Sequence, residues 1–108
     1  MKIIINRLFV PKGYSGIALF PFIFVSKKEY LKNPDFINHE KIHLQQQKEL
    51  LIIFFFLWYS LDFLIKYIKY QNWQKAYYNI IFEREAYQNQ NNPNYLKIRK
   101  PFAFLQVL

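Results

Sequence analysis

The segment Asn33-Pro34-Asp35-Phe36-Ile37-Asn38-His39-Glu40-Lys41-Ile42-His43 decides where the helical part of the chain begins. Asparagine is a favourable N-cap, proline is well tolerated at the first helical position, and the aspartate after it places an acid in the first turn. We therefore expect a helix from Pro34. Its second and third turns carry His39 and His43, which share one face because they are four residues apart. Both imidazoles can then bind one metal ion.

These residues also complete the pattern His-Glu-x-x-His, where x is any residue. Glu40 follows His39 directly, so its carboxylate can reach a water molecule on the metal and accept a proton from it. Three fixed positions match by accident in well under about one in a hundred chains of this length. The pattern therefore predicts a water-activating site with Zn²⁺ as the ion. The alternative interpretation is two histidines, on the surface or in the core, that happen to lie one turn apart.

Length and composition bound the class of protein. We expect residues 1–108 to form a single domain, because the chain is long enough for one core and too short for two. Hydrophobic residues make up 53%, which excludes a disordered chain, and the absence of cysteine excludes thiolate ligands. The first ten residues, MKIIINRLFV, are too short and too interrupted for a signal peptide. We expect a cytoplasmic protein, and leave open a peripheral position on the inner face of the membrane.

The charge balance is strongly basic. The formal net charge is +8, from 15 Lys and Arg against 7 Asp and Glu. Such an excess favours anionic partners, either lipid headgroups or nucleic acid, although a simply solvated basic surface is the other interpretation. No recognition helix or RNA-binding motif is evident, so nucleic acid is disfavoured and an anionic membrane surface remains a candidate partner. The basic residues form three clusters: Lys27, Lys28 and Lys32; Lys66, Lys69 and Lys75; and Lys97, Arg99 and Lys100.

The N-terminal quarter has the composition of β-strands. Residues 3–10 and 16–25 are rich in β-branched and aromatic side chains, and prolines and glycines lie between them. We expect a hairpin or two short strands. Because proline cannot donate to a ladder, the second segment should be an edge strand or be interrupted at Pro21.

Helical character dominates the remainder of the chain. Neither proline nor glycine occurs between Pro34 and Pro93, so we expect helices over residues 34–91, with a break near residues 70–72. A short last helix follows Pro93 and ends at Pro101. The predicted fold is α+β, mainly α, with a short N-terminal β-hairpin or pair of strands followed by three to four helices. Both histidines lie on the first helix.

A third metal ligand is needed, because catalytic zinc sites use three protein ligands and leave the fourth position to water. With no cysteine and no other histidine, it must be a carboxylate. Glu83 is favoured: its helical spacing from Ala76 and Ile80 places it in an apolar face, where a metal removes the cost of a buried charge. A structural alternative is an ion pair with a neighbouring arginine or lysine. Asp62 is the second choice, and Glu85 is expected on the surface. The candidates are Glu29, Asp35, Glu49, Asp62, Glu83 and Glu85.

The stretch Leu50–Ile68 (LLIIFFFLWYSLDFLIKYI) is about long enough to cross a membrane, although it contains Asp62 and Lys66. A complete crossing would leave Glu83 roughly 30 Å from the histidines. We therefore expect the stretch to be core, a homo-oligomer interface or a surface that lies on a membrane. A straight helix would also keep Glu83 too far away, so we expect a bend near Trp58–Asp62.

The segment Phe82-Glu83-Arg84-Glu85-Ala86-Tyr87 resembles the second motif of the gluzincin metallopeptidases. The nearest form is Glu-x-x-Ala-Asp, found in the CAAX-prenyl and heat-shock endopeptidase group. There the first Glu is the third zinc ligand, which implies Glu83, and Ala86 matches the small residue. Tyr87 stands where that group has an aspartate that supports the ligands. The whole chain, with NHEKIHLQQQ followed by FEREAY, also resembles small bacterial HExxH proteins of similar length without an established activity.

Together the two motifs imply a zincin-like domain that hydrolyses peptide bonds in a peptide or protein substrate. Zn²⁺ held by His39, His43 and Glu83 would activate water, and Glu40 would be the general base. The other interpretation is a non-catalytic module for membrane or subunit contact, in which the histidines are structural or only bind metal. Candidate oxyanion donors are Tyr77, Tyr78 and Tyr87. Candidate supports for the histidine rings are Asn38, Gln46, Gln47 and Glu49.

Overall fold

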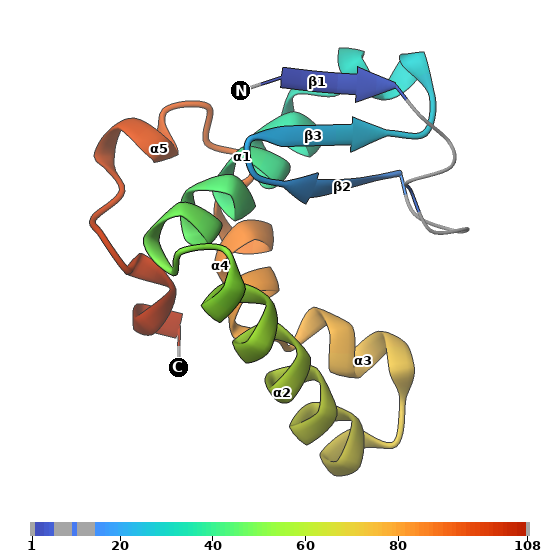
Figure 1. Ribbon diagram of the computed structural model, residues 1–108, viewed down its shortest axis with the longest axis vertical. Coiled ribbons are helices and arrows are strands. Elements are labelled where there is room, and N and C mark those ends of the chain that lie inside the picture. The colour runs from blue at the N-terminus through green and yellow to red at the C-terminus, as the bar shows by residue number, and fades with distance from the viewer. Residues whose placement is uncertain (1, 6–9, 11–14, 108) are drawn as a thin grey trace.

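The computed structural model describes residues 2–5, 10 and 15–107. The α+β, mainly α class is confirmed, and Figure 1 shows a small sheet at one end of the molecule with helices extending away from it. The elements in chain order are β1 (Lys2–Ile5), β2 (Gly16–Leu19), β3 (Phe22–Val25), η1 (Lys28–Lys32), α1 (Pro34–Glu49), α2 (Ile53–Tyr70), α3 (Trp73–Tyr78), α4 (Ile81–Asn89), α5 (Tyr95–Ile98) and η2 (Ala103–Val107), where η denotes a 3-10 helix.

The sheet has the strand order β1-β3-β2. β2 and β3 form an antiparallel hairpin in which Leu19 pairs with Phe22, and Pro21 lies in the turn between them. The predicted interruption at Pro21 is therefore confirmed, and it divides residues 16–25 into two strands. β1 pairs with β3 in parallel, which leaves β2 at an edge of the sheet. Residues 6–9 of the predicted first strand lie outside the described residues.

β2 packs against α1 at very close range. A Cβ atom added to Gly16 would lie 2.6 Å from the ring of Phe36 on α1, so only glycine fits there. Gln47 joins the same two elements: its side chain donates to the carbonyl of Ala18 at 2.8 Å and accepts from the amide of Phe20 at 2.7 Å. The buried cluster beneath the sheet contains Ala18, Ile23, Val25 and Leu44, with Phe36 packed against it.

The bend that the metal site requires is present, but its predicted position is wrong. α1 ends at Glu49 and α2 begins at Ile53, and the two helices are bent by 113°. α2 runs unbroken through Trp58–Asp62, where we expected the bend. Leu51 and Ile52 make the turn with φ angles of 57° and 65°. Side chains with a Cβ rarely adopt this conformation, least of all β-branched ones, so nothing in local propensity marks the position.

The predicted break near residues 70–72 is confirmed. α2 ends at Tyr70, Gln71 adopts the left-handed conformation with φ 53°, and the Asn72 side chain caps α3 by accepting from the amide of Lys75 at 3.0 Å. A further turn at Asn79 and Ile80 separates α3 from α4. The described residues therefore form five α-helical segments, of which α3 and α5 have only six and four residues.

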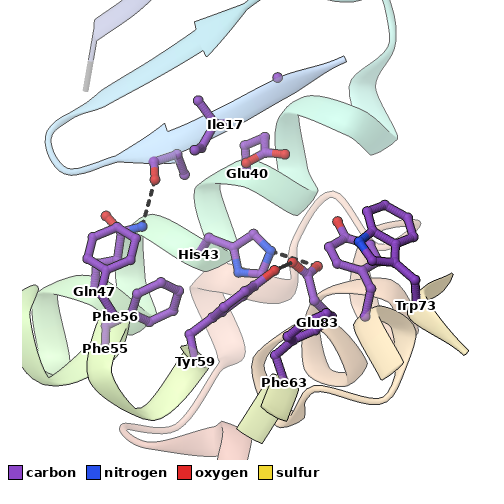
Figure 2. A pocket seen from close by; sticks show the side chains of 13 residues that line it. Ile17, Glu40, His43, Gln47, Phe55, Phe56, Tyr59, Phe63, Trp73 and Glu83 are labelled. Carbon is purple, nitrogen blue, oxygen red and sulfur yellow. Dashed lines mark hydrogen bonds and ion pairs between the residues drawn. The ribbon is translucent and has the colours of Figure 1, made fainter. Parts of the chain in front are cut away.

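A second apolar core lies between α2, α4 and η2. Between this core and β2 is a cavity of about 310 Å³, shown in Figure 2, to which Ile17 of β2, Phe56 and Phe63 of α2, and Trp73 of α3 all contribute. Within the described ranges, no single helix is both long and apolar enough to span a bilayer; α1 and α2 satisfy those criteria only together, as a bent pair. The buried members of the second core are Phe55, Ile80, Ile81, Phe82 and Phe104.

Candidate metal centre

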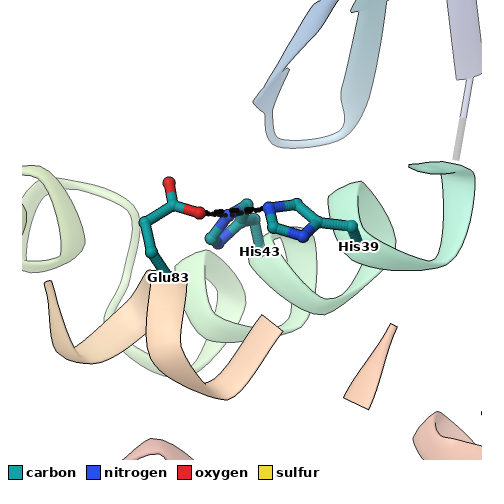
Figure 3. Close-up of side chains that lie close together, drawn as sticks. All are labelled: His39, His43 and Glu83. Atoms are coloured by element: carbon teal, nitrogen blue, oxygen red, sulfur yellow. Dashed lines mark hydrogen bonds and ion pairs between the residues drawn. The ribbon is translucent and has the colours of Figure 1, made fainter. Parts of the chain in front are cut away.

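His39, His43 and Glu83 converge on one point, as Figure 3 shows. Atom Oε1 of Glu83 lies 3.0 Å from Nε2 of each histidine, and the two Nε2 atoms are 3.1 Å apart. Tetrahedral ligands about 2.0–2.1 Å from zinc lie roughly 3.3 Å from one another, so an ion fits after shifts of a few tenths of an ångström. All three side chains are buried. The predicted ligand set therefore forms one group that can hold a metal ion.

The α1 helix and α4 bring these donors together. The N-cap operates as predicted, since the Asn33 side chain accepts from the amide of Phe36 at 3.1 Å. This start places His39 and His43 on the side of α1 that faces α4, and Glu83 lies in the first turn of α4. The bend after α1 lets α4 return to the histidines.

Hydrogen bonds on the far side of each ring hold the histidines in place. Nδ1 of His43 lies 2.8 Å from Oε1 of Gln46, and Nδ1 of His39 lies 2.7 Å from Oε1 of Gln90. An amide oxygen can only accept, so with both glutamine amides in these orientations each Nδ1 carries a hydrogen. In the neutral ring Nε2 then has its lone pair free and directed at the shared point. This is the tautomer that coordination through Nε2 requires.

The orientation of the Gln46 amide follows from its other partners. Its Nε2 donates to the carbonyl of Phe82 at 3.1 Å and to Oε1 of Glu85 at 2.9 Å. A flipped amide would place its oxygen against these two acceptors, which is unfavourable. Oε1 of Gln46 therefore faces His43. Among the described residues, Gln46 is the one of the four candidate supports that forms a hydrogen bond with a histidine ring.

Asn38, Gln47 and Glu49 act further from the ligands. The Asn38 side-chain amide donates to the carbonyl oxygens of Asn89, Gln90 and Asn92 at 2.8–3.3 Å, and so holds the segment that carries Gln90. Gln47 joins α1 to β2, and Glu49 binds Arg99 at 2.7 Å. Gln90 itself was missed by sequence reasoning, because it lies near the end of the helical region expected over residues 34–91, where no motif singles it out. Its spacing of two helical turns from Glu83 was the available signal.

Glu85 is buried, so the prediction that it is a surface acid is wrong. Its side chain is bound by Arg99 through Nε at 2.6 Å and by the hydroxyl of Tyr95 at 2.6 Å, in addition to Gln46. Burial raises the pKa of Glu85, but the hydrogen bonds from Arg99, Gln46 and Tyr95 lower it more, so it stays below its usual range. Helical spacing correctly predicted that Glu85 and Glu83 lie on different sides of the helix. It could not show that the C-terminal segment covers that side of α4.

The ligands are electrostatically coupled. Burial raises the pKa of Glu83, but the charge of His43 and hydrogen bonds from both rings outweigh this and hold it well below its usual range. Burial likewise lowers the pKa of His43, and the Glu83 carboxylate raises it to about 9. The hydroxyl of Tyr59 donates to Oε2 of Glu83 at 2.6 Å, which leaves Oε1 to the histidines. Sequence reasoning missed Tyr59, because its contact joins two helices without any local pattern.

Glu40 lies beside the ligands and lines the cavity together with His43 (Figure 2). It is 7% exposed, and it makes no hydrogen bond or ion pair with the part of the chain that the structure describes. Burial raises the pKa of Glu40, and the charges of His43 and His39 offset part of that rise. A nearly buried carboxylate to which no described residue donates has the properties expected of a general base.

A second, more polar hollow of about 560 Å³ shares four lining residues with the first. Of the three tyrosines considered as oxyanion donors, Tyr77 lines both hollows, whereas Tyr78 and Tyr87 line the second. Tyr87 also packs edge-on against His39, with ring centroids 4.4 Å apart. The shared residues are Gly16, Glu40, Trp73 and Tyr77.

The remaining acidic candidates are not part of the cluster. Asp62 binds Lys66 at 2.9 Å and accepts from the amide of Ile81 at 2.7 Å, where α4 begins. Glu29 lies in η1 and Asp35 in the first turn of α1. Of the two preferred carboxylates, Glu83 and not Asp62 lies in the group that could hold a metal ion.

Comparisons with known proteins give no match: no family model, no curated protein and no solved structure is similar to this chain. The resemblance to gluzincins therefore rests on the two motifs, and the metal centre rests on the convergence of His39, His43 and Glu83.

Proposed function

We propose that the protein is a zinc-dependent peptidase in which His39, His43 and Glu83 hold the ion and Glu40 is the general base. The observation that carries this proposal is the convergence of three buried donor atoms next to a carboxylate that the described residues leave unpaired. A purely structural pair of histidines would not require both rings to direct Nε2 at one carboxylate oxygen.

The donor set suits zinc. Two imidazole nitrogens and one carboxylate oxygen form a common catalytic zinc set, whereas Ca²⁺ and Mg²⁺ prefer oxygen ligands throughout. Three protein ligands leave a fourth position for water or substrate. Gln46 and Gln90 accept hydrogen bonds from the two histidine rings, and Tyr59 donates one to Glu83, which is the outer support that such sites use.

The side chains around the ligands have the roles that peptide hydrolysis needs. When bound, zinc would supply a Lewis acid and lower the pKa of a water molecule towards about 7. Glu40 accepts the proton that the attacking water loses and passes it to the leaving amine. Tyr77 lines both hollows, and its hydroxyl is our choice to donate to the carbonyl oxygen as negative charge develops.

The cavity suggests the kind of substrate. It opens beside Glu40 and is lined by aromatic side chains, so it suits a large apolar side chain next to the scissile bond. Gly16 and Ala18 of the edge strand β2 line the same cavity. An extended peptide can pair with such an edge through its main chain. The aromatic lining residues are Phe55, Phe56, Tyr59, Phe63, Trp73 and Tyr77.

The test compares the zinc-loaded protein with its Glu40→Gln variant on peptides that carry Phe or Asp at one varied position. We expect the wild type to cleave the Phe peptides preferentially, and Glu40→Gln to lose about a hundredfold or more in kcat while it binds zinc equally well. Glu29→Gln, which removes an exposed acid in η1, should change neither property. If the wild type and Glu40→Gln cleave the peptides equally while both bind zinc, the protein binds metal but is not a peptidase.

A further inference from the structure

One face of α2 carries an unbroken apolar stripe, which we call the α2 stripe. Its residues recur at helical spacing, so at about 100° per residue they occupy roughly 120° of arc. No polar residue of α2 falls within that arc. Each member is more than half exposed: Ile53 69%, Phe54 58%, Leu57 56%, Leu61 60%, Leu64 53%, Ile65 60% and Ile68 63%.

The opposite face of α2 is already used by the fold. Phe55 is buried in the second core, Tyr59 binds Glu83, and Asp62 caps α4 and pairs with Lys66. The helix therefore cannot rotate to hide the stripe. A contiguous apolar patch of this kind on a folded domain marks an interaction site.

The distribution of acidic residues favours an anionic partner. The fold uses five of the seven acids internally, either by burial or by pairing with a base, and the other two lie near the sheet. The lysines around α2 consequently give its surface a positive charge. The buried acids are Glu40, Glu83 and Glu85, the paired ones are Glu49 and Asp62, and those near the sheet are Glu29 and Asp35.

Exposed lysines lie at both ends of the α2 stripe. Lys69 is in the last turn of α2 and Lys75 follows in α3, and their ammonium groups lie 5.2 and 4.5 Å from the ring centroid of Tyr70. At the other end Lys48 lies just before the bend. Lys100 is at the same corner, because its neighbour Arg99 binds Glu49.

We propose that the α2 stripe binds the surface of an anionic lipid bilayer, with the helix parallel to the membrane plane and the flanking lysines at the headgroups. An interfacial helix buries its apolar face about 5–10 Å deep, and long lysine side chains can reach the phosphates from either end. A second copy of the chain fits less well, because apposed stripes would bring the same lysines together on two chains of charge +8. This proposal is independent of catalysis.

Flotation with phosphatidylcholine vesicles, with and without phosphatidylglycerol, tests it on the full chain. We expect binding at least about tenfold tighter when the anionic lipid is present, and weaker binding at high salt. The triple variant Leu57→Gln/Leu61→Gln/Ile65→Gln should bind about a hundredfold or more weakly. Leu31→Gln, on η1 and 38% exposed, should bind as the wild type does.

A matched charge pair tests the lysines. Lys69→Gln/Lys75→Gln and Lys27→Gln/Lys28→Gln remove the same charge from opposite parts of the molecule. The first pair should weaken binding by about tenfold or more, and the second by less than about twofold. Equal effects would show that binding depends on net charge and not on the position of the lysines, and would overturn the role assigned to Lys69 and Lys75.

A fluorescent label gives a second readout that needs no disruptive substitution. The chain has no cysteine, so Leu61→Cys and Leu31→Cys each accept one environment-sensitive dye. Anionic vesicles should shift the emission of the dye at position 61 to the blue and leave that at position 31 unchanged. An unshifted dye at position 61, or wild-type protein that stays unbound, would overturn the proposal. So would a dimer that the triple variant disperses without any vesicle binding, because the stripe would then belong to a second copy.

Discussion

Gln46 and His43 form a hydrogen bond of 2.8 Å between Oε1 and Nδ1, and the amide that makes it is fixed from behind by Glu85. The ring of a candidate metal ligand is thus connected through one neutral side chain to the buried ion pair of Glu85 with Arg99. The C-terminal segment that contributes Arg99 therefore supports the candidate metal centre without reaching it.

Replacing Gln46 by Leu should weaken zinc binding by about ten- to a hundredfold, because Nδ1 of His43 loses its acceptor and the ring is free to turn. Competition with a chromophoric chelator measures this affinity. Gln45→Leu is the matched control, since Gln45 is only half-buried and lies on the same helix. Equal affinities for the two variants would show that the hydrogen bond does not orient His43.

Tyr59 should strengthen zinc binding through its hydrogen bond to Glu83. Its hydroxyl binds Oε2 of Glu83 at 2.6 Å, so Tyr59→Phe releases that oxygen while it keeps the aromatic packing. We expect an affinity for zinc about tenfold lower. Tyr67→Phe removes an exposed hydroxyl from the same helix and should have no effect. An unchanged affinity in Tyr59→Phe would contradict the role assigned to this hydrogen bond.

Zinc binding should release a proton near neutral pH. The Glu83 carboxylate holds the pKa of His43 at about 9 in the metal-free protein, and Glu83 itself stays ionised. Between about pH 6.5 and pH 9 the ion must displace the proton on His43, so its apparent affinity should rise about tenfold per pH unit and then level off. Calorimetric titrations in buffers of different ionisation enthalpy count the released proton. A pH-independent affinity would exclude this coupling.

The same shift predicts how the metal-free protein responds to alkali. Because the folded pKa of His43 lies above its unfolded value of about 6.5, the stabilisation is complete below that pH and is lost as the pH rises towards 9. Urea unfolding should therefore show a free energy of unfolding that falls across this window. His43→Gln should flatten the dependence, and a wild type without any such fall would argue against the ion pair with Glu83.

Among the basic residues, Arg99 is the one whose replacement should lower the free energy of unfolding most. Its guanidinium binds both Glu85 and Glu49, and its side chain is 2% exposed. Arg99→Met leaves two largely buried carboxylates without a counter-ion, so we expect a loss of about 3–5 kcal/mol in urea unfolding. Arg84→Met, half-buried on α4, should cost much less. Adding Glu85→Gln should recover part of the loss, and a double variant as unstable as the sum of both would refute the pairing.

The sequence was informative wherever a local pattern carries the chemistry. The spacing of His39 and His43, the apolar setting of Glu83, the Asn-Pro helix start and the proline between β2 and β3 all predicted what the structure contains. Each depends on residues within a few helical turns or on backbone chemistry that one residue dictates.

The features that could not be predicted depend on long-range contacts or on strain. Leu51 and Ile52 turn the chain in a conformation that their side chains disfavour, so the bend is stabilised by packing that local sequence does not reveal. Tyr59 reaches Glu83 across 24 residues. The local sequence around Glu85 resembles that of a surface acid, because its partner Arg99 lies in the C-terminal segment.

Zinc titration of the purified protein against its Glu83→Ala variant tests the central claim most directly. We predict one zinc ion per wild-type chain, and an affinity at least about a hundredfold lower when Glu83 is removed, because two histidines alone hold zinc poorly. Glu29→Ala, which removes an exposed acid in η1, should bind as the wild type does. A wild-type chain that binds no zinc, or a Glu83→Ala variant with undiminished affinity, would contradict the metal centre.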